Sequence, residues 1–190
     1  MKRPAEQRAD EGFTLTEMLV TILLFSILTT VIMNVLITSM RAQTRSVERT
    51  DTLNAAKRAL ERTAADLREA NPLLVAKARE IKSVSTLNGV STTTTYSIST
   101  DGTRLLVTKS VGSAIGTPKT LLRGLSLGAT GAAFTYSGAG GAPLQPLTVG
   151  GSEYDTSEVQ LVSLSLPVRL PSANSTIRVD QQVDLRNQES

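Results

Sequence analysis

Twenty consecutive residues without a charged side chain, from Met18 to Ile37, constrain this chain more than any other feature of its sequence. At about 1.5 Å rise per residue, a helix of this length spans the roughly 30 Å hydrocarbon core of a bilayer. Its few polar side chains are hydroxyls and one amide, which bond back to the helix or across to a partner helix. The run predicts a membrane-spanning helix close to the N-terminus.

A cleavable secretory signal is the main alternative for this run. Such a signal has a shorter apolar region, of about 7–15 residues, followed by a small-x-small cleavage site. Here the run is longer, and the sequence that follows, Ser39-Met40-Arg41, is a poor cleavage site. We therefore expect a retained helix. Basic residues are nearly balanced on its two flanks, so the positive-inside rule does not orient it.

Composition argues against several classes of enzyme. The 190 residues include no histidine and no cysteine, so the chain lacks the commonest general base, the commonest transition-metal ligand and a thiol nucleophile. Aromatic residues make up 3% and the net charge is +3 without a basic run, which offers little for stacking on bases or binding phosphates. We expect no enzyme, no cofactor and no direct contact with nucleic acid.

A short motif leads into the apolar run. Gly12, Phe13 and Glu17 stand in the sequence Gly-Phe-Thr-Leu-Thr-Glu-Met-Leu-Val, which resembles the processing site of type IV prepilins and type II secretion pseudopilins. In that family a short hydrophilic leader ends in glycine, an apolar residue begins the mature chain, and a glutamate is its fifth residue. Thr16 and Met18 depart mildly from the family's pattern, where aliphatic residues are more usual, and the leader is less basic.

The resemblance implies that a membrane-embedded prepilin peptidase cuts after Gly12 on the cytoplasmic side and methylates the new amino terminus of Phe13. It also implies an orientation, with the leader inside and the head outside the cytoplasm. The protein would lie in the inner membrane as a single-pass protein and then in a periplasmic or cell-surface filament.

Glu17 is the most informative residue of the motif. A carboxylate in a bilayer costs free energy unless it finds a partner. By the resemblance, that partner is the Phe13 amine of the adjacent subunit, and the pair sets the register of a helical filament. The alternative is that Glu17 only marks the water-facing edge of the membrane helix.

Past the membrane the sequence still favours helix. Residues 41–70 contain no Pro or Gly, and Asn71-Pro72 then ends the helix, because the residue before proline disfavours helical backbone. We expect one helix over 13–70, with an apolar stripe that packs on a globular domain rather than in a coiled coil. The stripe consists of Leu53, Ala56, Leu60, Ala64, Leu67 and Leu74.

Strand patterns follow the helix. Residues 92–100 and 103–109 flank Asp101-Gly102, a strong hairpin signal. Phe134 and Tyr136 indicate a strand before a glycine-rich loop at 138–141. Alternating residues predict strands at 162–168, where Pro167 favours a sheet edge, and at 177–186.

A long helix covering an antiparallel sheet is an α+β fold. The expected divisions are a leader (1–12), a transmembrane and filament-core helix (13–40), its amphipathic continuation (41–71) and a β-rich, pilin-like head (72–190).

Three acidic residues, Glu153, Asp155 and Glu158, are weak candidates for a calcium site, since Ca²⁺ prefers oxygen ligands. A solvated turn is the simpler interpretation, and we assign no catalytic residue and no firm metal site.

The sequence predicts a structural minor subunit of a type IV pilus or a type II secretion pseudopilus, in a priming or tip role for adhesion, motility, DNA uptake or secretion. A looser resemblance of the C-terminal half to minor pilins and the J-type pseudopilin favours a minor subunit. The implied partners are the prepilin peptidase, other pilin or pseudopilin subunits through the N-terminal helix, an assembly ATPase and an inner-membrane platform. The alternative is a single-pass, membrane-anchored adhesin or scaffold that forms no filament.

Overall fold

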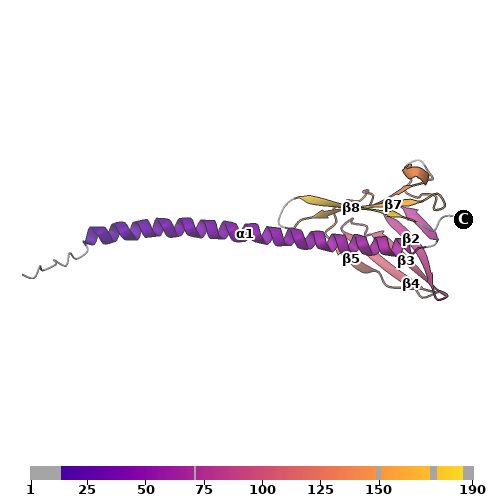
Figure 1. Ribbon diagram of the computed structural model, residues 1–190, viewed down its shortest axis with the longest axis horizontal. Coiled ribbons are helices and arrows are strands. Elements are labelled where there is room, and N and C mark those ends of the chain that lie inside the picture. The colour runs from indigo at the N-terminus through magenta and orange to yellow at the C-terminus, as the bar shows by residue number, and fades with distance from the viewer. Residues whose placement is uncertain (1–13, 71, 149–150, 172–174, 186–190) are drawn as a thin grey trace, which may run out of the picture. The chain divides into compact units, whose positions relative to one another are not determined.

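The computed structural model describes residues 14–70, 72–148, 151–171 and 175–185 (Figure 1). The chain divides into two compact units, Met1–Arg45 and Ser46–Ser190. The helix α1, Leu15–Arg68, contributes residues to both. Its bounds differ by two residues at each end from the expected 13–70, so the prediction of one long helix is confirmed.

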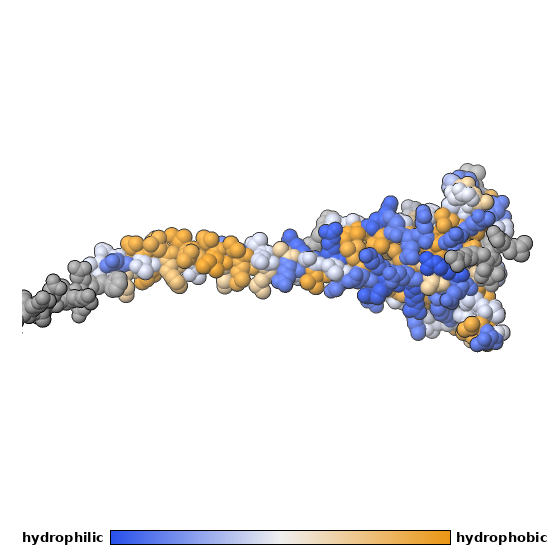
Figure 2. Space-filling view, viewed as in Figure 1, coloured by the Kyte–Doolittle hydropathy of each residue, from blue (hydrophilic) through white to orange (hydrophobic). Residues whose placement is uncertain are grey.

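The α1 residues of the first unit form a hydrophobic surface that no other described residue covers. The large apolar side chains from Leu15 to Met40 are 40–78% exposed, and Figure 2 shows them as a hydrophobic band along the helix. Five hydroxyl side chains within the band donate to the carbonyl four residues earlier, at 2.7–2.8 Å, and they are Thr21, Ser26, Thr29, Thr30 and Thr38. Because these bonds satisfy the hydroxyl donors within the helix, they are compatible with a lipid environment. By length and composition, α1 is long and apolar enough to cross a bilayer.

The second unit contains two antiparallel sheets. The first has five strands in chain order, and the second has three strands in the order β6-β7-β8. The strands of the first sheet are β1 (Leu73–Lys77), β2 (Glu80–Leu87), β3 (Val90–Ile98), β4 (Arg104–Val111) and β5 (Lys119–Arg123). Those of the second are β6 (Phe134–Ser137), β7 (Leu161–Arg169) and β8 (Thr176–Asp184), and the short 3-10 helix η1 (Ala139–Gly141) follows β6.

One hydrophobic core joins both sheets to the last turns of α1. Along α1 the buried residues recur at helical spacing, and they are Ala56, Ala59, Leu60, Thr63, Ala64 and Leu67. The stripe therefore packs on its own head, as expected. Leu74 does not belong to it, because α1 ends before this residue, which lies in β1 with 46% of its surface exposed.

A polar contact fixes α1 against the first sheet. The hydroxyl of Tyr96 on β3 donates to the Asp66 carboxylate of α1, and the Nζ atom of Lys109 on β4 lies 3.0 Å from Asp66 Oδ2. Tyr96 is fully buried. Burial, and then the hydrogen bond to Asp66, raise the pKa of its hydroxyl, so Tyr96 stays a neutral donor.

We expect Tyr96→Phe to lower the free energy of unfolding by about 1.5–3 kcal/mol, the usual contribution of a hydrogen bond to a charged group. Chemical denaturation of the full chain in detergent measures the change. Tyr154→Phe is the matched control, because the Tyr154 hydroxyl makes no hydrogen bond to any of the described residues, and only its ring contacts Tyr136. Equal losses in both variants would contradict the assigned contact.

The hairpin predicted around Asp101-Gly102 is confirmed, since β3 and β4 pair from Ile98↔Leu105 onward. Its turn is wider than two residues. The backbone N–H of Ser99 donates to the carbonyl of Arg104 at 3.0 Å, and the residues between them form the loop. Side-chain contacts described below hold this wider turn, so the local dipeptide signal located the hairpin but not its shape.

Pro167 lies in β7, the central strand of its sheet, so the expected edge position is wrong. The physical reason is local. The N–H groups of Ser165 and Arg169 donate away from β8, to carbonyls outside the three strands. Pro167 faces that same side, past the Leu161–Leu164 stretch that pairs with β6. No ladder donor is needed there, and the Pro167 carbonyl still accepts from the N–H of Ser126 at 2.8 Å.

Candidate functional site

The part of the chain that the structure describes begins at Thr14, directly before α1. Thr14 caps the helix: its carbonyl accepts from the N–H groups of Glu17 at 3.0 Å and Met18 at 3.2 Å. Its hydroxyl oxygen also accepts from the N–H of Glu17 at 3.3 Å. This side-chain bond satisfies a backbone donor that has no partner within the helix.

Thr14 is not among the site residues expected from the sequence. The signal was present, because Thr-x-x-Glu directly before an apolar run is the pattern of a capping box. Glu17 is the third helical position, and its backbone N–H is the donor that the Thr14 hydroxyl satisfies. The family motif drew attention to the glutamate alone.

Glu17 is exposed in the first turn of α1. The positive end of the helix dipole favours a carboxylate at this position. No side chain in the described part of the chain bonds or pairs with its carboxylate, so its charge is available to another molecule. Gly12 and Phe13, the expected cleavage and methylation residues, lie outside the described residues.

The three calcium candidates do not converge. Glu153 Oε1 lies 3.7 Å from the Lys77 ammonium, which would repel a cation. Asp155 Oδ1 accepts from the N–H and the hydroxyl of Ser157 at 2.9 and 2.6 Å, and these bonds lower the pKa of Asp155. Glu158 joins neither contact. Among the described residues, no group of three His, Cys, Asp or Glu side chains is placed to hold a metal ion.

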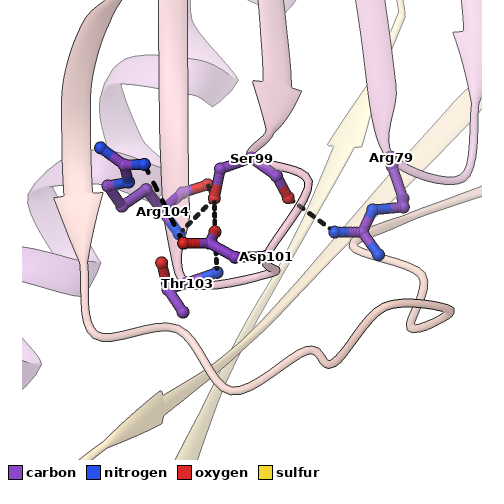
Figure 3. Close-up of polar contacts among 5 residues, drawn as sticks. All are labelled: Arg79, Ser99, Asp101, Thr103 and Arg104. Atoms are coloured by element: carbon purple, nitrogen blue, oxygen red, sulfur yellow. Dashed lines mark hydrogen bonds and ion pairs between the residues drawn. The ribbon is translucent and has the colours of Figure 1, made fainter.

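A cluster of polar contacts fixes the loops at one end of the first sheet (Figure 3). Arg79, between β1 and β2, donates to the Ser99 carbonyl at 2.8 Å and the Gly128 carbonyl at 2.9 Å, and also to the Ala129 carbonyl. One guanidinium thus joins three loops. Such a residue positions the backbone of these loops.

Asp101 organises the β3–β4 loop within this cluster. Its carboxylate accepts from the Ser99 hydroxyl and, at 3.0 Å, from the N–H of Thr103. These bonds lower the pKa of Asp101 to about 2, and the bond from the Ser99 hydroxyl has the largest effect. The pattern is an Asx-type turn, in which the side chain replaces a backbone acceptor.

The lowered pKa predicts how this loop responds to acid. The folded pKa lies below the unfolded value of about 3.9, so the contribution of Asp101 to stability is complete above that value and is lost as pH falls toward about 2. We expect the stability difference between the native chain and Asp101→Asn to shrink from pH 5 to pH 2.5. Denaturation at both pH values measures it, and a constant difference would contradict the assignment.

A comparison with family models identifies the N-terminal segment. Residues 7–33 match the prokaryotic N-terminal methylation motif. This range contains Gly12, Phe13, the Thr14 cap, Glu17 and most of the apolar run. No protein of curated function and no solved structure matches the chain.

The chain therefore carries the prepilin-type N-terminal methylation motif. The resemblance to type IV pilins and pseudopilins is confirmed, and a long N-terminal helix with antiparallel sheets is the arrangement typical of pilins. The minor or J-type kind remains a prediction.

Proposed function

We propose that the protein is a structural subunit of a filament of the type IV pilus or pseudopilus class. The observation that carries the proposal is the match to the methylation motif, in a chain whose first helical segment is covered by no other part of the chain that the structure describes. The head hides its own core, whereas α1 of the first unit exposes every large apolar side chain. Filament assembly gives that surface a partner.

A helix of this kind needs lipid or other helices around it, because water penalises its apolar surface. The membrane serves as the store, and packing of equivalent helices in a filament core replaces the lipid contacts. The internally bonded hydroxyls of Thr21, Ser26, Thr29 and Thr30 let the helix enter either environment without unsatisfied donors.

Glu17 sets the register between subunits in this proposal. Cleavage after Gly12 creates a positive amine on Phe13, and the exposed carboxylate of Glu17 receives the amine of a neighbouring subunit. Both charges then leave water together. A buried pair of this kind acts more through specificity than through net stability, since desolvation offsets much of the attraction.

The remaining assignments follow from this role. The prepilin peptidase processes and methylates the chain, an ATPase and an inner-membrane platform drive assembly, and the head recognises other subunits. The protein starts in the inner membrane with its head outside the cytoplasm and ends in a periplasmic or surface filament. We infer a minor subunit in a priming or tip position, and a structural rather than a catalytic role.

Processing by the peptidase tests the proposal. We expect the chain to lose its leader in cells with a prepilin peptidase and to keep it in cells without one. Gly12→Val should stay uncleaved in both, because a side chain there hinders the extended backbone in a protease cleft. Glu11→Ala, one residue earlier, is the control and should be cleaved. A native chain of the same length in both strains would overturn the proposal.

A further inference from the structure

Four exposed aliphatic residues lie together at one end of the first sheet. They are Leu87, Val90, Val111 and Ile115, at 75, 51, 52 and 88% exposure, and we call them the aliphatic tip. Strand pairing brings them together, because Leu87 opposes Val90 and Val111 opposes Thr92, two residues beyond Val90. Figure 2 shows hydrophobic side chains at the lower right of the head, where Figure 1 places the end of β4.

The tip continues the core face of the sheet. Leu87, Val90 and Val111 stand at even spacing from the buried Ile81, Tyr96 and Val107 of the same strands, so they share a face with them. The helix does not reach this far. Its residue Asp66 contacts Lys109, two residues before Val111, and α1 ends at Arg68. An apolar patch left open in this way marks an interaction surface.

The stretches that carry the tip contain no charge. Residues 83–100 and 110–118 include no Asp, Glu, Lys or Arg, and Lys109 and Lys119 border the second stretch. The tip therefore lacks the charged groups with which protein partners fix their orientation. Of the two bordering lysines, Lys109 pairs with Asp66, and Lys119 is compatible with anionic headgroups.

The backbone of both turns is largely paired internally. Asn88-Gly89 form a two-residue turn with positive φ at both residues, and this turn closes the Leu87↔Val90 pair. In the second turn Val111 and Ala114 exchange both backbone hydrogen bonds, at 3.2 and 3.1 Å. The N–H of Gly112 also donates to the Ser91 carbonyl at 3.2 Å. Donors already paired in this way lower the cost of moving the turns out of water.

The small size of the aliphatic tip favours a lipid surface over a protein as its partner. A stable protein interface uses about 20–30 residues on each side, and four aliphatic residues on two projecting turns fall far short of this. A lipid surface requires neither a large area nor matching shape. We propose that the aliphatic tip inserts into the interfacial region of a lipid bilayer. This inference does not rest on filament assembly.

The absence of cysteine from the chain makes a direct test possible. The full chain carrying Ser113→Cys, which lies in the second turn but outside the four residues, is labelled with an environment-sensitive fluorophore and held in nanodiscs. Vesicles of phosphatidylcholine and phosphatidylglycerol are then added. Brominated lipid is placed either in the vesicles or in the nanodisc, so quenching identifies the bilayer that the tip enters. Thr135→Cys, on the exposed face of β6, is the control label.

We expect brominated lipid to quench the label at residue 113 and not the label at residue 135. Adding Ile115→Asp should weaken the interaction by about tenfold, since it replaces an inserted aliphatic group with a charge. Leu147→Asp is the matched control, because Leu147 is 62% exposed away from the tip, and it should change nothing. Absence of quenching in both arrangements would overturn the proposal. Tip-dependent association of nanodisc-held chains without quenching would overturn it too, and would assign the tip to protein docking.

Discussion

Glu17→Ala is expected to leave the chain cleaved after Gly12 but to keep it out of the filament. The variant removes the only carboxylate of the first turn of α1, so the amine of a neighbouring Phe13 would enter an apolar environment unpaired. An uncompensated charge there costs several kcal/mol, and we expect the chain in sheared filaments to fall by about tenfold or more. Immunoblots of sheared and cell-bound fractions measure the effect.

Glu17→Gln is the matched control for this experiment, because it keeps the size and hydrogen-bonding capacity of the side chain but not its charge. If the charge of Glu17 is required for assembly, the amount of Glu17→Gln in sheared filaments should fall as it does for Glu17→Ala. Thr16→Ala, its neighbour, should assemble normally. Normal assembly of Glu17→Ala would contradict the account, would return Glu17 to the edge of a membrane helix, and would favour a membrane-anchored envelope protein.

Gly102→Ala is expected to destabilise the head by about 3 kcal/mol or more, through backbone strain and a collision together. Gly102 has a φ of +70°, and a Cβ atom added to it would lie 2.3 Å from the carbonyl oxygen of Gly128. The Gly128 carbonyl is held by Arg79, so it is not free to move aside. Denaturation followed by circular dichroism measures the loss.

Gly89 offers a matched control for the collision. Its φ is +78°, but a Cβ atom there would meet nothing within 4 Å. Gly89→Ala should therefore cost only the backbone strain, about 1–2 kcal/mol. Equal losses at the two glycines would show that the Gly102–Gly128 contact contributes nothing.

The sequence was most informative where a local pattern determines structure. The uncharged run and the absence of Pro and Gly predicted α1, and strict alternation predicted β7 and the apolar face of β8, because helical and strand periodicities are properties of neighbouring residues. Asp101-Gly102 located the hairpin for the same reason.

What the sequence missed depends on contacts between distant residues. The division into two sheets and the place of Pro167 in a central strand follow from which segments lie alongside β7, and no local pattern encodes that. The Asp66–Tyr96–Lys109 contact and the loops held by Arg79 join residues 20 to 50 positions apart. In the N-terminal site, a family motif found Glu17, while the Thr14 cap was visible in the sequence and was overlooked.

Intact-mass spectrometry of the protein from its native membranes tests the central claim most directly. The account predicts a chain that begins at Phe13 and is about 14 Da heavier than the unmodified sequence, the mass of one added methyl group. A chain that keeps Met1–Gly12 in cells with an active prepilin peptidase would contradict it.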